Sequence, residues 1–201
     1  MNVVDRRECG LRQHLQMMSR FIDSAKPGAA LCMILRSADS DAAKALVGMK
    51  GALQRAGITA RVILTKLDPE GDLKQLFASL SELAPQSPPH ELIRWARNPR
   101  LLDAHEQVTF GELACWSGDA MRREADKRNA LAIFDDGAGE SVAFGQRSFA
   151  ALWRCSVEVP ARRLIGPASA RPCGAYEQAA DPSVDPAALR PILQGWPLIR
   201  H

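Results

Sequence analysis

The sequence has few features of a membrane, secreted or metal-binding protein. No stretch approaches the roughly 18 apolar residues that a helix needs to cross a bilayer, and the start, MNVVDRRECG, has no basic segment leading into an apolar one. The five cysteines are an odd, scattered set without a C-x-x-C pair, which is typical of reduced thiols rather than disulfides or a zinc site. We therefore predict a soluble, cytoplasmic protein without a metal site.

Several nucleotide and hydrolase motifs are also missing. The sequence contains no G-x-G-x-x-G, no G-x-x-x-x-G-K-[ST] and no G-x-S-x-G, and neither His90-Glu91 nor His105-Glu106 has a second histidine four residues on. We therefore predict no cofactor. The formal net charge of +3 is too small to attract nucleic acid or anionic lipid over a long range, so the charge alone does not favour such a partner.

The sequence does show alternating strand and helix patterns. An amphipathic helix over residues 1–28 ends at a Lys-Pro-Gly sequence, and apolar runs at 29–35 and 58–67 have strand length. A helical pattern over 37–56 separates these two runs, and a short helix follows through residue 83. Two such units in succession predict an α/β fold with a mostly parallel or mixed central sheet flanked by helices.

The second half of the chain continues the sheet and then changes composition. We predict strands at 91–96, 107–116 and 129–134, which complete the sheet by about residue 135, and a helix at 141–156. Seven of the 13 prolines fall in 160–201. The predicted organisation is thus a capping helix at 1–28, an α/β domain at 29–159 and a Pro-rich C-terminal extension at 160–201 that wraps over the domain or is partly disordered.

One region resembles a known family. From residue 117 the sequence reads SGDAMRREADKRNALAIFDD, and the helix after it ends in FAALWR. This order resembles the end of a phospholipase D superfamily domain, where a strand enters a G-S-x-N turn, followed by a basic loop, an Asn that starts the next strand, and a helix ending in aromatic-x-x-L-W. The matching positions are Ser117 and Asp119 in the turn, Arg122 and Arg123 in the loop, and Asn129 in the strand. The resemblance covers about residues 29–159 and implies one half of that fold.

The catalytic residues of that family are replaced in this sequence. The family uses H-x-K-x-x-x-x-D, and its His, Lys and Asp positions fall on Asn98, Arg100 and His105. A carboxamide cannot attack phosphorus, whereas Arg100 keeps a cation for phosphate oxygens. The resemblance therefore implies a catalytically degraded domain that acts by binding or assembly, with a phosphate-containing small molecule as candidate ligand. Since a full site in the family joins two halves, a single half implies a homodimer.

Two other functions are compatible with the same residues. An active phosphodiesterase or other hydrolase could use His105, Asp103 and Arg100 as rearranged acid, base and oxyanion holder. A nucleic-acid-associated factor could use arginines against phosphates, namely Arg100, Arg122, Arg123 and Arg128. Each feature also has a structural interpretation: His105 as a surface histidine, the arginine-rich segment as a solvated loop, and Asp135 with Asp136 as turn residues before Gly137.

Overall fold

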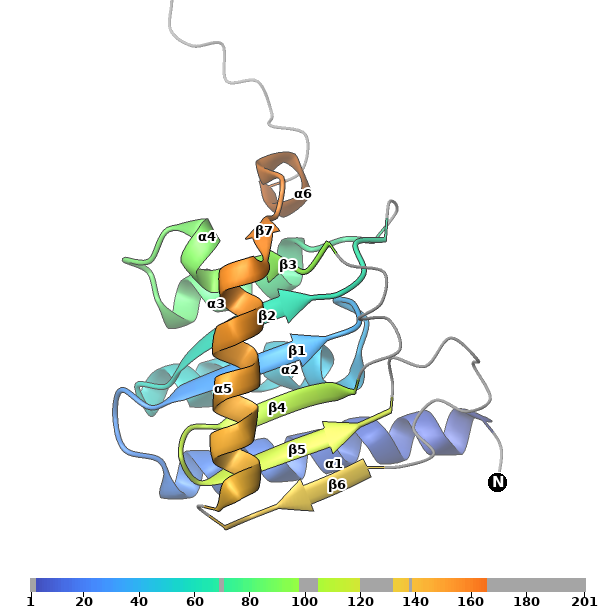
Figure 1. The fold of residues 1–201 in the computed structure, drawn as a ribbon, viewed down its shortest axis with the longest axis vertical. Coiled ribbons are helices and arrows are strands. Elements are labelled where there is room, and N and C mark those ends of the chain that lie inside the picture. Colours follow the sequence, from blue (N-terminus) through green and yellow to red (C-terminus); the bar gives the residue numbers. More distant parts are fainter. Residues whose placement is uncertain (1–2, 69–70, 98–104, 120–131, 138, 166–201) are drawn as a thin grey trace, which may run out of the picture. The chain divides into compact units, whose positions relative to one another are not determined.

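The computed structural model describes residues 3–68, 71–97, 105–119, 132–137 and 139–165, with side chains from Gly10 onward (Figure 1). Its elements are α1 (Val3–Ser24), β1 (Ala30–Leu35), α2 (Asp41–Arg55), β2 (Thr59–Leu64), α3 (Lys74–Leu83), α4 (Pro89–Leu92), β3 (Ile93–Trp95), β4 (Glu106–Phe110), β5 (Ala114–Gly118), β6 (Ala132–Asp135), α5 (Glu140–Cys155), β7 (Val157–Glu158) and α6 (Ala161–Ile165). No helix among these is long and apolar enough to cross a membrane.

The strands form one seven-stranded sheet in the order β6-β5-β4-β1-β2-β3-β7. Of the six strand pairs among the described residues, β1–β2 and β2–β3 are parallel and the other four are antiparallel. The predicted α/β fold is therefore confirmed, and the sheet is mixed. Local signals define the first units as predicted: Ser40 caps α2 by accepting a hydrogen bond from the Ala43 N–H, and α2 ends just before Gly57, whose φ of +66° suits glycine.

Helices cover the two faces of the sheet unequally. Helices α1, α2 and α3 lie on one face over the main apolar core, while α5 runs alone across the strands on the other face (Figure 1). Side chains alternate between the faces, so Leu31, Met33 and Leu35 of β1 enter the main core and Ile34 enters a smaller cluster under α5. The α5 face is thus the less covered side of the sheet.

The prediction of one strand over 107–116 is wrong, because this segment is the β4–β5 hairpin. The chain turns at Gly111, whose φ of +56° favours glycine, and the Leu113 N–H donates to the Phe110 carbonyl. Phe110 and Ala114 flank the turn four positions apart and both belong to the main core, as do Val108 and Trp116, so the core-facing side chains keep the same every-second-residue spacing on both sides of the turn. The apolar pattern therefore concealed the reversal of the chain.

The sheet does not end at residue 135 as predicted. β7 adds an edge strand, with Trp95 of β3 paired to Val157, and buried Val159 and Leu164 join the main core from the segment that follows. Residues 160–165 therefore pack with the domain. The remainder of the predicted C-terminal extension lies outside the described residues.

Candidate functional site

The sheet surface formed by β4, β5 and β6 is polar where it faces α5. Gln107 pairs with Ser117 and Thr109 pairs with Cys115, so all four side chains point to the same side, opposite to the main core. β6 adds Ile133 and Asp135, the register partners of Ser117 and Cys115, to this face. The N-terminal half of α5 therefore packs above a floor of amide, hydroxyl and thiol groups.

Helix α5 approaches this floor closely at Gly145. The Gln107 Nε2 donates to the Gly145 carbonyl at 2.9 Å and to the Thr109 Oγ1 at 3.2 Å, which fixes one turn of the helix to β4. A Cβ at position 145 would lie 2.9 Å from the Cys115 Sγ and from the Gln107 Nε2. Only glycine leaves room for this contact, and it sets the height of α5 above the sheet.

A pocket of about 610 Å³ lies beside this contact. Its lining combines apolar, neutral polar and charged side chains: Gln107, Cys115, Ser117, Ile133, Asp135, Glu140, Ser141, Ala143, Phe144 and Arg147. Two large apolar side chains are exposed at this place, Ile133 at 59% and Phe144 at 63%. A pocket with convergent polar groups and an exposed apolar border is typical of a binding surface.

The protonation states of two lining groups follow from their surroundings. The side chain of Ser141 and the Gly137 N–H, 3.0 Å from the Asp135 Oδ1, hydrogen-bond the Asp135 carboxylate and hold its pKa below the usual range. Burial raises the pKa of the Cys115 thiol, although the hydrogen bond with Thr109 opposes this. At neutral pH the pocket therefore contains a carboxylate and a neutral thiol, and a neutral thiol is a poor nucleophile.

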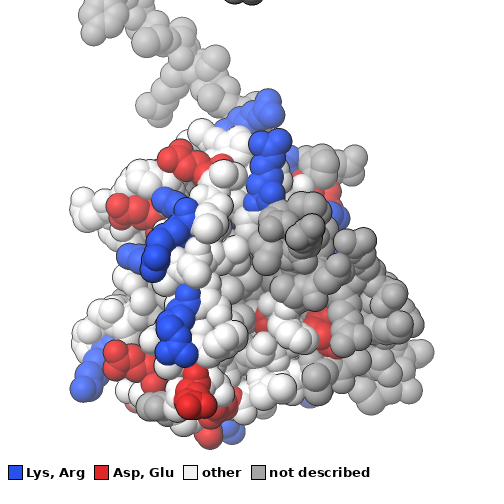
Figure 2. Space-filling model, in the orientation of Figure 1, with Lys and Arg blue, Asp and Glu red and all other residues white. Residues whose placement is uncertain are grey.

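Charges of both signs border the pocket. Glu140 is the first residue of α5 and Arg147 lies two turns further on, both exposed. Figure 2 shows this face: basic side chains lie along α5, and acidic side chains gather at the end where the helix begins. The described lining thus carries two carboxylates and one guanidinium.

The structure describes three of the predicted site residues. Ser117 lines the pocket, and its hydroxyl donates to the Glu106 carbonyl at 3.4 Å. His105 is exposed just before β4, and Asp119 is buried just after β5; neither lines the pocket. The others lie outside the described residues: Asn98, Arg100, Asp103, Arg122, Arg123, Arg128 and Asn129.

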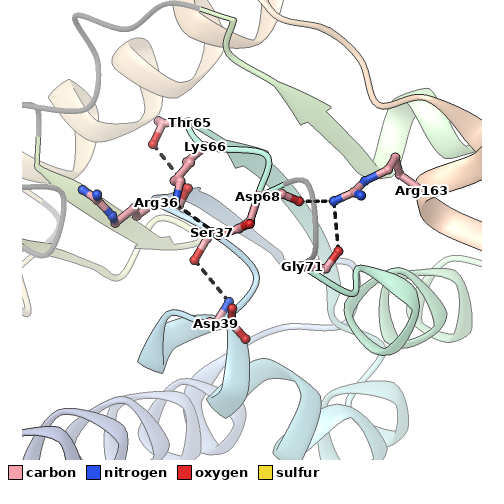
Figure 3. Close-up of polar contacts among 8 residues, drawn as sticks. All are labelled: Arg36, Ser37, Asp39, Thr65, Lys66, Asp68, Gly71 and Arg163. Atoms are coloured by element: carbon pink, nitrogen blue, oxygen red, sulfur yellow. Dashed lines mark hydrogen bonds and ion pairs between the residues drawn. The ribbon is translucent and has the colours of Figure 1, made fainter.

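A second polar cluster lies at the carboxyl ends of β1 and β2 (Figure 3). The Lys66 N–H donates to the Arg36 carbonyl at 2.8 Å, and the Lys66 ammonium pairs with the Asp68 carboxylate at 3.1 Å. Arg163 of α6 donates to the carbonyls of Asp68 and Gly71. These contacts hold the loops to one another and to α6, so the cluster has a structural role that needs no ligand.

Comparisons with known proteins add no family assignment. No protein-family model matches the chain, and no curated protein matches it in sequence. Within the described ranges, no group of three His, Cys, Asp or Glu side chains is placed to hold a metal ion. The case for function therefore depends on the geometry of the pocket.

The sequence pattern points to Ser117 but not to most of the other residues that line the pocket. Asp135 was interpreted as a turn residue, which it is, because it accepts from the Gly137 N–H; it also borders the pocket. Two signals in the helix pattern could have pointed to the site. Gly145 interrupts a good helix, and Phe144 falls outside the stripe that contains Phe149.

Proposed function

We propose that this protein is a catalytically degraded phospholipase D-like domain that acts by binding and assembly, and that a second copy covers the pocket beside α5. The observation that supports this most is the composition of the pocket border. Exposed Phe144 and Ile133 lie beside Asp135, Glu140 and Arg147. Large exposed apolar side chains bordered by polar residues are common at protein interfaces.

The charges favour a second copy as the occupant. In a dimer with twofold symmetry the same surface meets itself, so an Arg147 of one copy can approach a carboxylate of the other, and the reverse contact follows by symmetry. A free phosphate fits the described lining less well, because Asp135 and Glu140 oppose an anion that Arg147 attracts. The phosphate-containing ligand is therefore a secondary proposal.

The polar groups of the pocket support binding over nucleophilic catalysis. Burial keeps the Cys115 thiol protonated at neutral pH, and the Ser117 hydroxyl donates to a backbone carbonyl instead of to a base. Neither group is activated as a nucleophile in this arrangement. We expect no turnover of a simple phosphodiester such as bis(p-nitrophenyl) phosphate; turnover that is lost in Ser117→Ala would contradict the proposal.

Sedimentation velocity of matched variants tests the assembly. We expect the unaltered protein to be a dimer, Phe144→Asp to be a monomer, and Ile165→Asp to remain a dimer. Ile165 is a suitable control because it is also a large exposed apolar residue but lies on α6, which follows the edge strand β7 at the other end of the sheet. Circular dichroism of each variant checks that the fold is retained.

Charge reversal tests the symmetry of the contact. Arg147→Glu should weaken the dimer, and adding Glu140→Arg should restore it, because the double variant exchanges the signs across the interface. A monomer at every concentration of the unaltered protein, or a dimer that Phe144→Asp leaves intact, would reject this surface as the interface. Titration with inorganic phosphate, followed by NMR of Arg147, tests the secondary proposal.

A further inference from the structure

The two faces of β4 carry different chemistry, and the face opposite the pocket has a buried carboxyl group. Glu106 points toward the layer of α1 and α2, and its side chain is only 2% exposed. Its Oε1 accepts a hydrogen bond from the Arg36 N–H at 2.7 Å. Since Arg36 begins the loop between β1 and α2, this carboxyl group connects the start of β4 to that loop.

Two helices meet at the same place. Gly10 of α1 lies against the Asp41 carboxylate at the start of α2, so closely that a Cβ at position 10 would collide with it. One turn further along α1, the His14 Nδ1 donates to the Gly10 carbonyl at 2.9 Å, and the His14 ring packs edge-on against Trp116 of β5 with centroids 4.3 Å apart. Asp41 acts electrostatically on both His14 and Glu106.

The packing of His14 on Trp116 leaves two polar atoms unsatisfied. The His14 Nε2 and the Trp116 Nε1 are buried and have no hydrogen-bond partner among the described residues. Because the Nδ1 donates to a carbonyl, the Nε2 of neutral His14 is an acceptor, whereas the indole Nε1 is a donor. Buried polar atoms without partners weaken the packing that buries them. This contact is therefore a place where α1 can loosen from the sheet.

We propose that Glu106, Asp41, His14 and Trp116 form a pH-sensitive latch. With Glu106 protonated, α1 and the β1–α2 loop stay packed on β4 and β5; with Glu106 ionised, that packing loosens. The charged form is disfavoured by burial and by repulsion from Asp41, and favoured by the N–H and the guanidinium of Arg36. Asp119 is a further carboxyl group at this edge, since it follows Gly118, the partner of Glu106 on β5.

The ionisation of Glu106 falls in the neutral range of pH. Burial raises the pKa of Glu106 to about 7, whereas burial lowers the pKa of His14, which therefore stays neutral over the same range. Of these two groups, Glu106 is thus the one that changes charge near neutral pH. Its ionisation acts on the loop that begins at Arg36, which lies beside the loop after β2 (Figure 3). The latch therefore makes the packing of these loops, at the carboxyl ends of β1 and β2, depend on pH.

NMR of the Trp116 indole tests the latch. The Nε1–H resonance of Trp116, assigned by its loss in Trp116→Phe, should titrate with a midpoint near neutral pH. Amide-exchange protection of residues 36–40, corrected for intrinsic rates, should fall across the same range. Both changes should disappear in Glu106→Gln and persist in Glu112→Gln, which removes an exposed carboxyl group in the β4–β5 turn.

The variants distinguish a titration of Glu106 from a titration of a neighbouring group. An unchanged midpoint in folded Glu106→Gln, or loss of the titration in folded His14→Gln, would overturn the proposal. If Glu106→Gln does not fold, Asp41→Asn is the second test. Removing the charge of Asp41 should shift the midpoint to lower pH, because that charge favours the protonated form of Glu106; an unchanged or higher midpoint would overturn the latch.

Discussion

The two halves of helix α5 cover the same sheet in different ways. Its C-terminal half packs Phe149 against the apolar side chains of Ile34, Ile63 and Ala96, which come from β1, from β2 and from the residue after β3. Its N-terminal half lies over the amide, hydroxyl and thiol groups of β4 and β5, beside the pocket. One half therefore closes a packed core, and the other half borders the pocket.

The two halves of α5 pack differently because different side chains of the strands lie beneath them. Under the C-terminal half, Arg94 reaches up from β3: its guanidinium lies 5.0 Å from the centroid of the Trp153 ring and donates to the Trp153 carbonyl at 3.0 Å. Under the N-terminal half, Gln107 donates to the Gly145 carbonyl. In both halves a strand side chain donates a hydrogen bond to a helix carbonyl. Around Arg94 the C-terminal half is also packed with the Trp153 ring, whereas the N-terminal half has the pocket beside Gln107.

Substitutions of two phenylalanines of α5 should give the largest difference in stability between its two halves. Phe149 is 5% exposed and Phe144 is 63% exposed. Phe149→Ala should lower the free energy of unfolding by about 3 kcal/mol or more, because it leaves a cavity in the packed half. Phe144→Ala should change it by less than about 0.5 kcal/mol. Urea unfolding under monomeric conditions measures both, and equal losses would show that the two halves are packed alike.

The buried carboxyl group of Glu106, on the face of β4 opposite the pocket, should make the stability of the protein depend on pH. Glu106 has a pKa raised to about 7 by burial, so between its unfolded value of 4.5 and about 7 the folded protein binds more protons than the unfolded chain. The stabilisation by this group is complete below pH 4.5 and is lost as the pH rises through 7, a change of the order of 3 kcal/mol. Denaturant unfolding at several pH values should show this slope, and Glu106→Gln should flatten it. The same slope in Glu106→Gln would assign it to another group.

Substitution of Gly145 tests how closely α5 approaches the strands beneath it. Gly145→Ala should lower the free energy of unfolding by about 1 kcal/mol, because the strain of crowding Cys115 and Gln107 exceeds the gain in helix propensity. The control is Gly48→Ala in α2, where a Cβ meets only a Leu15 methyl group at 4.0 Å; this change should stabilise the protein by about 1 kcal/mol. Stabilisation by both substitutions would mean that α5 has room to move off the sheet.

The anchor at Arg94 should have an effect on stability no larger than that of Gly145→Ala. Arg94→Lys keeps the charge but loses the planar group that contacts the Trp153 ring and binds the His90 and Trp153 carbonyls. We expect a loss of about 1 kcal/mol in the free energy of unfolding and unchanged dimerisation. A monomeric Arg94→Lys would show that the two halves of α5 are coupled.

The sequence predicts the parts of this fold that local signals define. The first two strand–helix units were predicted within a few residues of β1, α2 and β2, because Ser40 and Gly57 mark the two ends of α2. The β4–β5 hairpin was missed because the core-facing side chains keep the same spacing on both sides of Gly111: Phe110 and Ala114 lie four positions apart and both enter the main core. Periodicity predicts which face a residue occupies, but not whether the chain has reversed between two residues on that face.

The candidate site was less predictable because it depends on contacts between distant segments. Ser117 was identified through a family resemblance, whereas Phe144 and Arg147 join the pocket only when α5 docks on β4 and β5. That docking requires Gly145 to meet Gln107 and Cys115, about thirty or more positions earlier in the chain. No local pattern encodes such a meeting.

The order of the strands also has a consequence for folding kinetics. β1 lies at the centre of the sheet between β2, which follows it after one helix, and β4, which the chain reaches only after β3. The strand–helix units and the β4–β5 hairpin can form from nearby residues, but the pairing of Ile34 with Gln107 must close a long stretch of chain. We therefore expect the β1–β4 junction to form late and to set the rate at which the whole sheet is completed.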